Sequence, residues 1–336
     1  MLIFILPSFA LALLVVWAAW LLYGVWRVIP KSNSDFEVAG GNYRGNRSPR
    51  NPAETFYADS GIARLLGAAL RMVDAVAPAL GTGSALRLFF TPLPWKLTAR
   101  RSVLPGRWTM TTWSFESVRL AAYRQRGLEP GRPVVLLVHG WAGSGAQMAT
   151  LGDALATAGY DPVLLDFPAH GRSGGWRSTL PQFSRALFLA VARLGPLHAI
   201  VAHSLGAVAT VHAAARGLAV ERLILVAPSA PPAMFLRWFA GAFGLSETVP
   251  ERMQQRIEAC EAIRLEEFEP EWLGARIVQP TLVIHDEGDR VAPHATAERL
   301  VAELQAARLH STRGLGHRRI LDDEAVARVV MNQMGS

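Results

Sequence analysis

The sequence of 336 residues contains a single cysteine, Cys260. One cysteine excludes a disulfide within the chain and a structural zinc site built on several cysteines. The histidines do not form a group with the spacing of metal ligands either. We interpret Cys260 as a small apolar residue on a helix.

Charged residues are absent from the stretch between Leu2 and Trp26, and Pro30 then closes the run. Its 25 residues would rise to about 37 Å as a helix, more than the roughly 30 Å of a bilayer core. Four aromatic residues crowd its second half, as is typical of a membrane interface: Trp17, Trp20, Tyr23 and Trp26. We therefore predict a transmembrane anchor at residues 1–30.

A cleavable signal peptide is the alternative interpretation of this segment. It would require early basic residues and a shorter apolar core, and the chain has neither. Basic residues follow the run: Arg27, Lys31, Arg44 and Arg47. The positive-inside rule then places the C-terminal body on the cytoplasmic side of a single-pass membrane protein.

In the N-terminal third of the chain, acidic residues are too few to balance the basic ones. The net charge of +7 arises from a surplus of +9 between Arg27 and Arg132, whereas residues 133–336 carry −2. A basic segment beside an apolar one suits an anionic membrane surface. No motif for nucleic-acid binding accompanies it, so we expect a membrane and not a nucleic acid as partner.

Residues 31–107 are predicted to be a linker and a basic, amphipathic region. Residues 31–55 are rich in Gly, Asn, Ser, Pro and Arg, as linkers are. A helix is predicted from Gly61 to Leu80, with Ser60 as a possible cap and Gly81 as its end. It could lie on the membrane or pack against the body, and both interpretations stay open.

From Trp108 to the C-terminus, strand and helix patterns alternate, which predicts an α/β domain at residues 108–336 with a mostly parallel sheet flanked by helices. Short apolar runs such as 134–138 and 223–226 suit strands that are buried on both faces. Residues 229–276 interrupt the alternation and are too long for a simple loop. We interpret them as a small helical cap.

The most informative motif is Ala202-His203-Ser204-Leu205-Gly206, placed between a predicted strand and a predicted helix. A nucleophilic serine on such a sharp turn needs small residues two places before and after it. Ala202 stands where Gly is more common, and its methyl group is tolerable. A helix N-cap is the other interpretation of Ser204, but the strand–turn–helix context favours a nucleophile.

A nucleophilic serine requires a base and an orienting acid. His317 follows Gly316 in a flexible loop after the last predicted strand, where such a base belongs. Asp289 follows a strand end and completes the order Ser, Asp, His, with Asp286 and Glu287 as close rivals. We interpret His198, His203 and His212 as packing residues. His139 is interpreted as a residue that shapes a loop.

An oxyanion hole needs two backbone N–H donors. Leu205 would supply one, and Trp141 in His139-Gly140-Trp141-Ala142-Gly143-Ser144 would supply the other. This Gly-rich loop fits neither the P-loop nor the dinucleotide fingerprint.

With these motifs in order, and with residues 166–173 between them, the chain from about Trp108 onward resembles the α/β-hydrolase family. The resemblance implies a serine esterase or lipase that works without a cofactor. We thus expect a hydrolase that cleaves small-molecule or lipid esters through an acyl-enzyme, with lipophilic acyl groups favoured. A thioesterase or amidase with the same triad is the alternative, and so is a non-catalytic binding protein of this fold.

Overall fold

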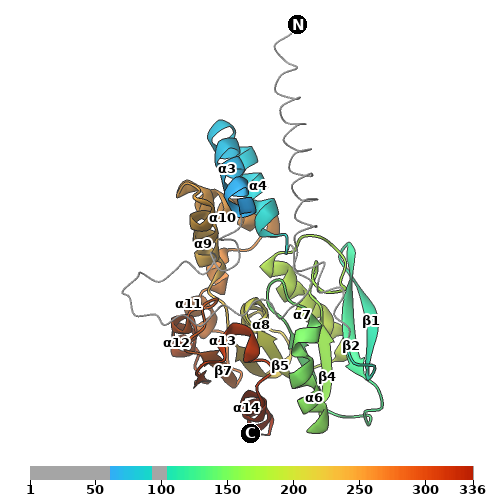
Figure 1. Ribbon diagram of the computed structural model, residues 1–336. Coiled ribbons are helices and arrows are strands. Elements are labelled where there is room, and N and C mark those ends of the chain that lie inside the picture. The colour runs from blue at the N-terminus through green and yellow to red at the C-terminus, as the bar shows by residue number, and fades with distance from the viewer. Residues whose placement is uncertain (1–60, 93–103, 336) are drawn as a thin grey trace.

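The computed structural model describes residues 61–92 and 104–335, and an eight-stranded sheet forms its centre (Figure 1). The strand order is β1-β2-β4-β3-β5-β6-β7-β8, with β2 antiparallel to β1 and β4 and all other neighbours parallel. The strands are β1 Trp108–Phe115, β2 Val118–Gln125, β3 Val134–Val138, β4 Asp161–Leu165, β5 Leu197–His203, β6 Val220–Val226, β7 Thr281–Asp286 and β8 Ala307–Thr312.

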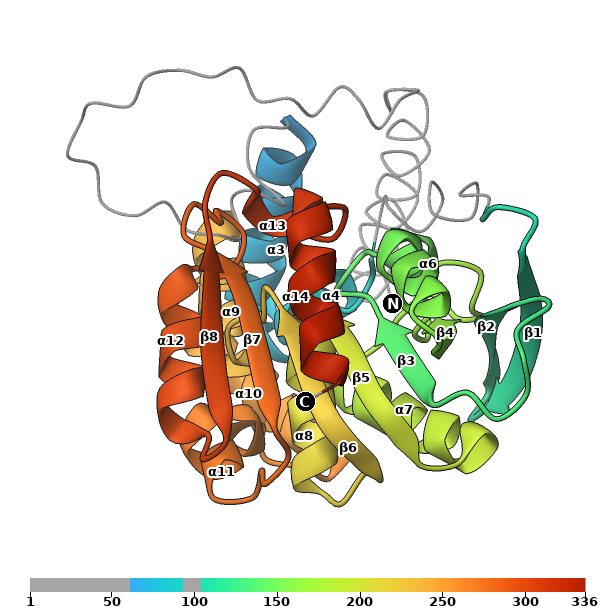
Figure 2. The same cartoon turned by 90° about the horizontal axis from the view of Figure 1, so that it is seen from below.

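Helices cover both faces of this sheet, and each face has its own apolar core (Figure 2). One face is covered by α7 Leu180–Leu194, α8 Leu205–Ala215 and α12 His294–Glu303, the other by α6 Ala149–Thr157 and α14 Glu324–Met334. Side chains of β3 alternate between the cores, with Leu136 and Val138 in one and Val135 and Leu137 in the other. This alternation explains why the central strands are continuous apolar runs. The predicted mostly parallel sheet, flanked by helices, is confirmed.

The C-terminal helix, α14, begins at Glu324. The Asp323 side chain accepts the N–H of Val326 at 3.0 Å and caps α14 there. A separate helical turn, α13 Gly316–Arg319, precedes it. His317 therefore lies on a helical turn, and the prediction of a flexible loop at this residue was wrong.

The segment between β6 and β7 is helical, as expected for residues 229–276. It contains α9 Pro232–Phe243, α10 Thr248–Glu261, the 3-10 helix η2 Leu265–Phe268 and α11 Pro270–Gly274. We refer to α9 and α10 as the cap helices.

The single helix predicted at 61–80 is wrong, because the chain turns back at Ala77. The structure has α3 Gly61–Val76 and then α4 Pro78–Phe89, which together we call the α3–α4 hairpin. Proline disfavours helical backbone at the residue before it and is favoured at the first position of a helix, so Pro78 ends α3 and starts α4. Gly81 does not stop a helix but lies inside α4 at the closest approach to α3, where a Cβ atom would come 2.5 Å from Asp74 Cα.

The α3–α4 hairpin packs against the cap helices, α3 on α9 and α4 on α10 (Figure 1). Arg71 donates to the Phe243 carbonyl at the end of α9 at 2.6 Å. Arg252 of α10 pairs with Asp74 at 2.5 Å and donates to Thr82 at 3.0 Å. Of the two interpretations of this region, packing against the body is thus observed.

The predicted anchor at residues 1–30 and the linker at 31–55 lie outside the described residues. Within 61–92 and 104–335, the structure has no helix that is both long and apolar enough to cross a membrane.

Candidate active site

Ser204 occupies the sharp turn between β5 and α8. Its backbone has a φ of 54° and a ψ of −121°, a combination that costs non-glycine residues energy and is typical of functional turns. Close approach explains the small residue at position 206, where a Cβ atom would lie 2.3 Å from the His139 carbonyl oxygen. The methyl group of Ala202 is fully buried in β5, so the fold accommodates alanine at this position.

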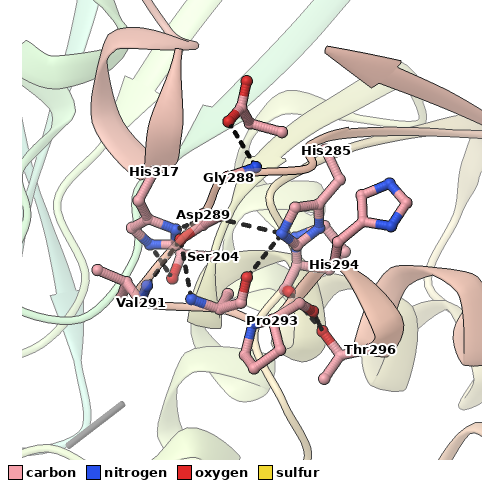
Figure 3. A network of polar contacts seen from close by, with 12 residues as sticks. Ser204, His285, Gly288, Asp289, Val291, Pro293, His294, Thr296 and His317 are labelled. Atoms are coloured by element: carbon pink, nitrogen blue, oxygen red, sulfur yellow. Dashed lines mark hydrogen bonds and ion pairs between the residues drawn. The ribbon is translucent and has the colours of Figure 1, made fainter. Parts of the chain in front are cut away.

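The structure brings Ser204, His317 and Asp289 together from three separate segments (Figure 3). His317 Nε2 lies 2.9 Å from Ser204 Oγ, and His317 Nδ1 lies 2.7 Å from Asp289 Oδ2. With a proton on Nδ1, the imidazole donates to the carboxylate and accepts the serine hydroxyl proton. This is the geometry that a nucleophile, its base and its orienting acid require.

The Asp289 side chain is buried, yet its environment favours the charged form. Burial alone raises the pKa of Asp289, but hydrogen bonds from His285, His317 and the Ala292 N–H outweigh burial and hold that pKa well below its usual value. Asp289 Oδ1 also accepts the N–H of Val291 at 2.8 Å and that of Ala292 at 3.0 Å. The carboxylate is therefore charged at neutral pH and fixed in orientation.

His285 is a site residue that the sequence analysis missed. Its fully buried ring donates from Nε2 to the Ala292 carbonyl at 2.9 Å, and the same nitrogen lies 3.4 Å from Asp289 Oδ2 (Figure 3). A second imidazole thus contacts the oxygen that faces His317. The position of His285, four residues before Asp289 at a strand end, was the available signal.

Asp286 and Glu287, the rivals for the acid, contact other groups. Asp286 is buried and accepts hydrogen bonds from the Thr312 hydroxyl at 3.0 Å and the Leu315 N–H at 2.9 Å. Glu287 is exposed and pairs with Arg313 at 2.8 Å. Only Asp289 reaches His317, while Asp286 ties down the segment that leads to it.

The predicted oxyanion loop passes directly over Ser204. A Cβ atom at Gly140 would lie 2.6 Å from Ser204 Cβ, so only glycine allows this approach. Trp141 follows Gly140 in the chain and Leu205 follows Ser204, so the two predicted N–H donors belong to the residues next to this close contact. The His139 ring fixes this loop, because its Nδ1 donates to the Gly140 carbonyl at 2.7 Å and its Nε2 accepts the Phe167 N–H at 3.1 Å.

Asp166 fixes the other end of this loop and was noticed in the sequence only as part of the 166–173 motif. Its buried carboxylate accepts the Gly145 N–H at 2.6 Å, the Arg172 N–H at 2.8 Å and the Tyr123 hydroxyl at 2.7 Å. The motif therefore orders the loops around the site without reaching Ser204.

His203 is buried behind the base. Its Nε2 donates to the His317 carbonyl at 2.8 Å, and the two rings lie 4.7 Å apart. Burial, together with repulsion from a charged His317, holds the pKa of His203 well below its usual value, so this ring is neutral. The other two predicted packing residues contact different groups, His198 the Glu221 carboxylate at 2.9 Å and His212 the Phe268 ring at 4.1 Å.

Among the described residues, no three His, Cys, Asp or Glu side chains are grouped so that they could hold a metal ion.

Comparison with known proteins agrees with this architecture. Residues 133–270, which include Ser204 and its elbow, match the family model of the alpha/beta hydrolase fold. Residues 133–270 belong to the α/β-hydrolase family. No curated protein matches this chain.

Solved structures resemble this chain closely enough to show its fold. Est1E from Butyrivibrio proteoclasticus has 18% identity and a TM-score of 0.54 over 68% of this chain and 99% of its own. The thioesterase domain from the curacin biosynthetic pathway has 19% identity and a TM-score of 0.51 over 68% and 99%. A membrane phospholipase A, described as a bacterial virulence factor, has 19% identity and a TM-score of 0.52 over 81% and 96%.

Proposed function

We propose that this α/β-hydrolase is a serine hydrolase that cleaves carboxylic esters through an acyl-enzyme on Ser204. The observation that carries the proposal is the continuous chain of short contacts from Ser204 Oγ through His317 to Asp289, at 2.9 and 2.7 Å. A serine that only caps α8 would not need a buried, charged carboxylate behind a histidine.

The reaction follows from these positions. As Ser204 Oγ attacks the ester carbonyl, its proton passes to His317 Nε2, and Asp289 stabilises the imidazolium that forms. The N–H groups of Trp141 and Leu205 would receive the negative charge on the carbonyl oxygen. The C–O bond to the alcohol then breaks, and His317 returns the proton to the leaving alkoxide. Water repeats the sequence on the acyl-enzyme and releases the acid.

A thioester or amide could be cleaved by the same groups, and a non-catalytic binding protein could have the same fold. The acid, base and nucleophile are all present in hydrogen-bonded order, which favours catalysis over binding alone. We favour lipophilic acyl groups because the apolar run Leu2–Trp26 would hold the domain at a bilayer, with the catalytic domain on the cytoplasmic side. A series of p-nitrophenyl esters of rising chain length, beside the matching thioesters, tests this preference.

The decisive experiment is labelling with a fluorophosphonate, which forms a covalent bond with an activated serine. We expect the wild type to be labelled and Ser204→Ala to remain unlabelled, with a loss of at least about a thousandfold in kcat on the best ester. Thermal unfolding of both proteins at the same temperature would show that the variant is folded. Labelling or near wild-type turnover by folded Ser204→Ala would disprove the assignment.

A further inference from the structure

The α3–α4 hairpin exposes four large apolar side chains, three of them at the end where the two helices meet. Of the eight large hydrophobic side chains that are exposed in the described residues, half belong to this hairpin. Their exposed fractions are 44% for Leu65, 58% for Met72, 83% for Val76 and 58% for Leu80. The turn itself, residues 75–80, reads Ala-Val-Ala-Pro-Ala-Leu and has no polar side chain.

These exposed residues do not belong to the face that packs on the cap. Leu70 is buried in the core, and Gly67 lies so close to α9 that a Cβ atom would come 2.9 Å from the Phe243 carbonyl. Leu65, Met72 and Val76 follow one another at intervals of seven and four residues and so form a separate stripe of α3. A helix that faces water on its outer side normally has polar residues there. We therefore expect this stripe and the turn to contact something other than water.

The charge of the hairpin and the N-terminal segment of the same chain indicate what covers these apolar side chains. The hairpin carries Arg64, Arg71 and Arg87 against Asp74 alone, and Asp74 is already paired with Arg252 of the cap. The uncharged run 2–26 lies earlier in the chain, separated from the hairpin by residues 27–60, and Arg27 and Lys31 follow it. An apolar tip on a hairpin of net positive charge, in a chain with such an N-terminal segment, matches an anionic lipid surface.

We propose that the tip of the α3–α4 hairpin, residues 72–80, inserts into the lipid surface of an anionic bilayer. The inference rests on the membrane location proposed above. The hairpin extends beyond α9 and α10 at the end away from the sheet (Figure 1), so insertion would place the cap helices between the bilayer and the sheet. The enzyme would then have two membrane contacts, an N-terminal anchor and a tip that orients the cap toward the lipid.

The test uses the full chain with the exposed Cys260 replaced by serine and one new cysteine labelled with nitrobenzoxadiazole. Val76→Cys places the probe at the tip. Val278→Cys is the matched control, because this valine is also exposed, at 72%, but lies just before β7, where the parallel strands begin. Each protein is reconstituted into vesicles of phosphatidylcholine and phosphatidylglycerol, with or without doxyl groups on the acyl chains.

We expect a blue-shifted emission for the probe at residue 76 and severalfold stronger quenching by doxyl lipid than at residue 278. Equal quenching at the two positions would overturn the proposal. A blue shift at residue 76 without doxyl quenching would also overturn it, since protein, such as a second copy, would then cover the tip. Fluorophosphonate labelling and retention after a carbonate wash, measured on the same samples, report the catalytic site and the anchor separately from the tip.

Discussion

At the scale of single residues, the two buried carboxylates Asp286 and Asp289 have different contacts and are expected to have different roles. Asp289 contacts the His317 imidazole, while Asp286 binds the backbone that leads to His317. We expect Asp289→Asn to lower kcat by about 10⁴, because an amide cannot hold the imidazole in the required tautomer. Asp286→Asn should cost far less in kcat. Steady-state kinetics on one ester tests the ranking, and the reverse order would transfer the orienting role to Asp286.

The pH dependence of the free energy of unfolding is a separate test of the contacts that Asp286 makes. Burial raises the pKa of Asp286, but the N–H groups of Leu315, Gly316 and Gly288 and the Thr312 hydroxyl lower it further than burial raises it. The carboxylate therefore stabilises the folded state above its unfolded pKa of about 4, and this stability is lost as the pH falls through the lower folded-state pKa. Asp286→Asn should be less stable than wild type at neutral pH and lose less stability on acidification, as urea unfolding at several pH values would show.

Three residues of the candidate site could be selected from the sequence, because each belongs to a short segment with its own local signal. Ser204 has the elbow pattern, and Asp289 and His317 each follow a strand end. For His285 the position four residues before Asp289 does not by itself predict a contact, because the contact depends on how the turn after β7 folds back. The same is true of Asp166, whose bonds to Gly145 and Tyr123 join segments far apart in the chain.

At the scale of elements, the α3–α4 hairpin shows what periodicity can and cannot predict. The apolar spacing from Gly61 onward predicted a helix, and Pro78 carried the signal for the turn that was overlooked. Which of two apolar faces packs on the cap is decided by non-local contacts such as that between Arg71 and Phe243, so the sequence left both interpretations of the helix open.

Two glycines of α4 test how tightly the hairpin closes. At Gly81 a Cβ atom would meet the backbone of Asp74 at 2.5 Å, whereas at Gly83 it would meet nothing within 4 Å. We expect Gly81→Ala to lower the free energy of unfolding by about 1–3 kcal/mol because α3 and α4 must separate. Gly83→Ala should raise it by about 0.4–1 kcal/mol because it restricts the unfolded chain. Chemical denaturation measures both, and a stabilising Gly81→Ala would contradict the close approach.

At the scale of the whole molecule, the alternation of strands and helices predicted the layers but not the strand order. Parallel strands need a covering helix between them, so the pattern after Trp108 implies helices on both faces of the sheet. The placement of β4 between β2 and β3 depends on pairings between distant segments, which no local pattern records. The association of α3 and α4 with α9 and α10 likewise joins elements separated by more than a hundred residues.

We expect the N-terminal run to hold the whole chain at a membrane in the cell. The run Leu2–Trp26 is long enough to span a bilayer, and a surplus of positive charge follows it. We expect residues 1–30 to remain on the mature protein and to resist extraction of the membrane fraction with carbonate. A chain that starts at Pro52 should be released by carbonate yet still react with fluorophosphonate, because the described elements begin only at Gly61. Its remaining association should be weak and sensitive to salt, since residues 87–132 carry nine Lys and Arg against two Glu. Mass spectrometry of the mature N-terminus decides between anchor and signal peptide: a start within residues 20–40 would show cleavage and place the catalytic domain on the exported side.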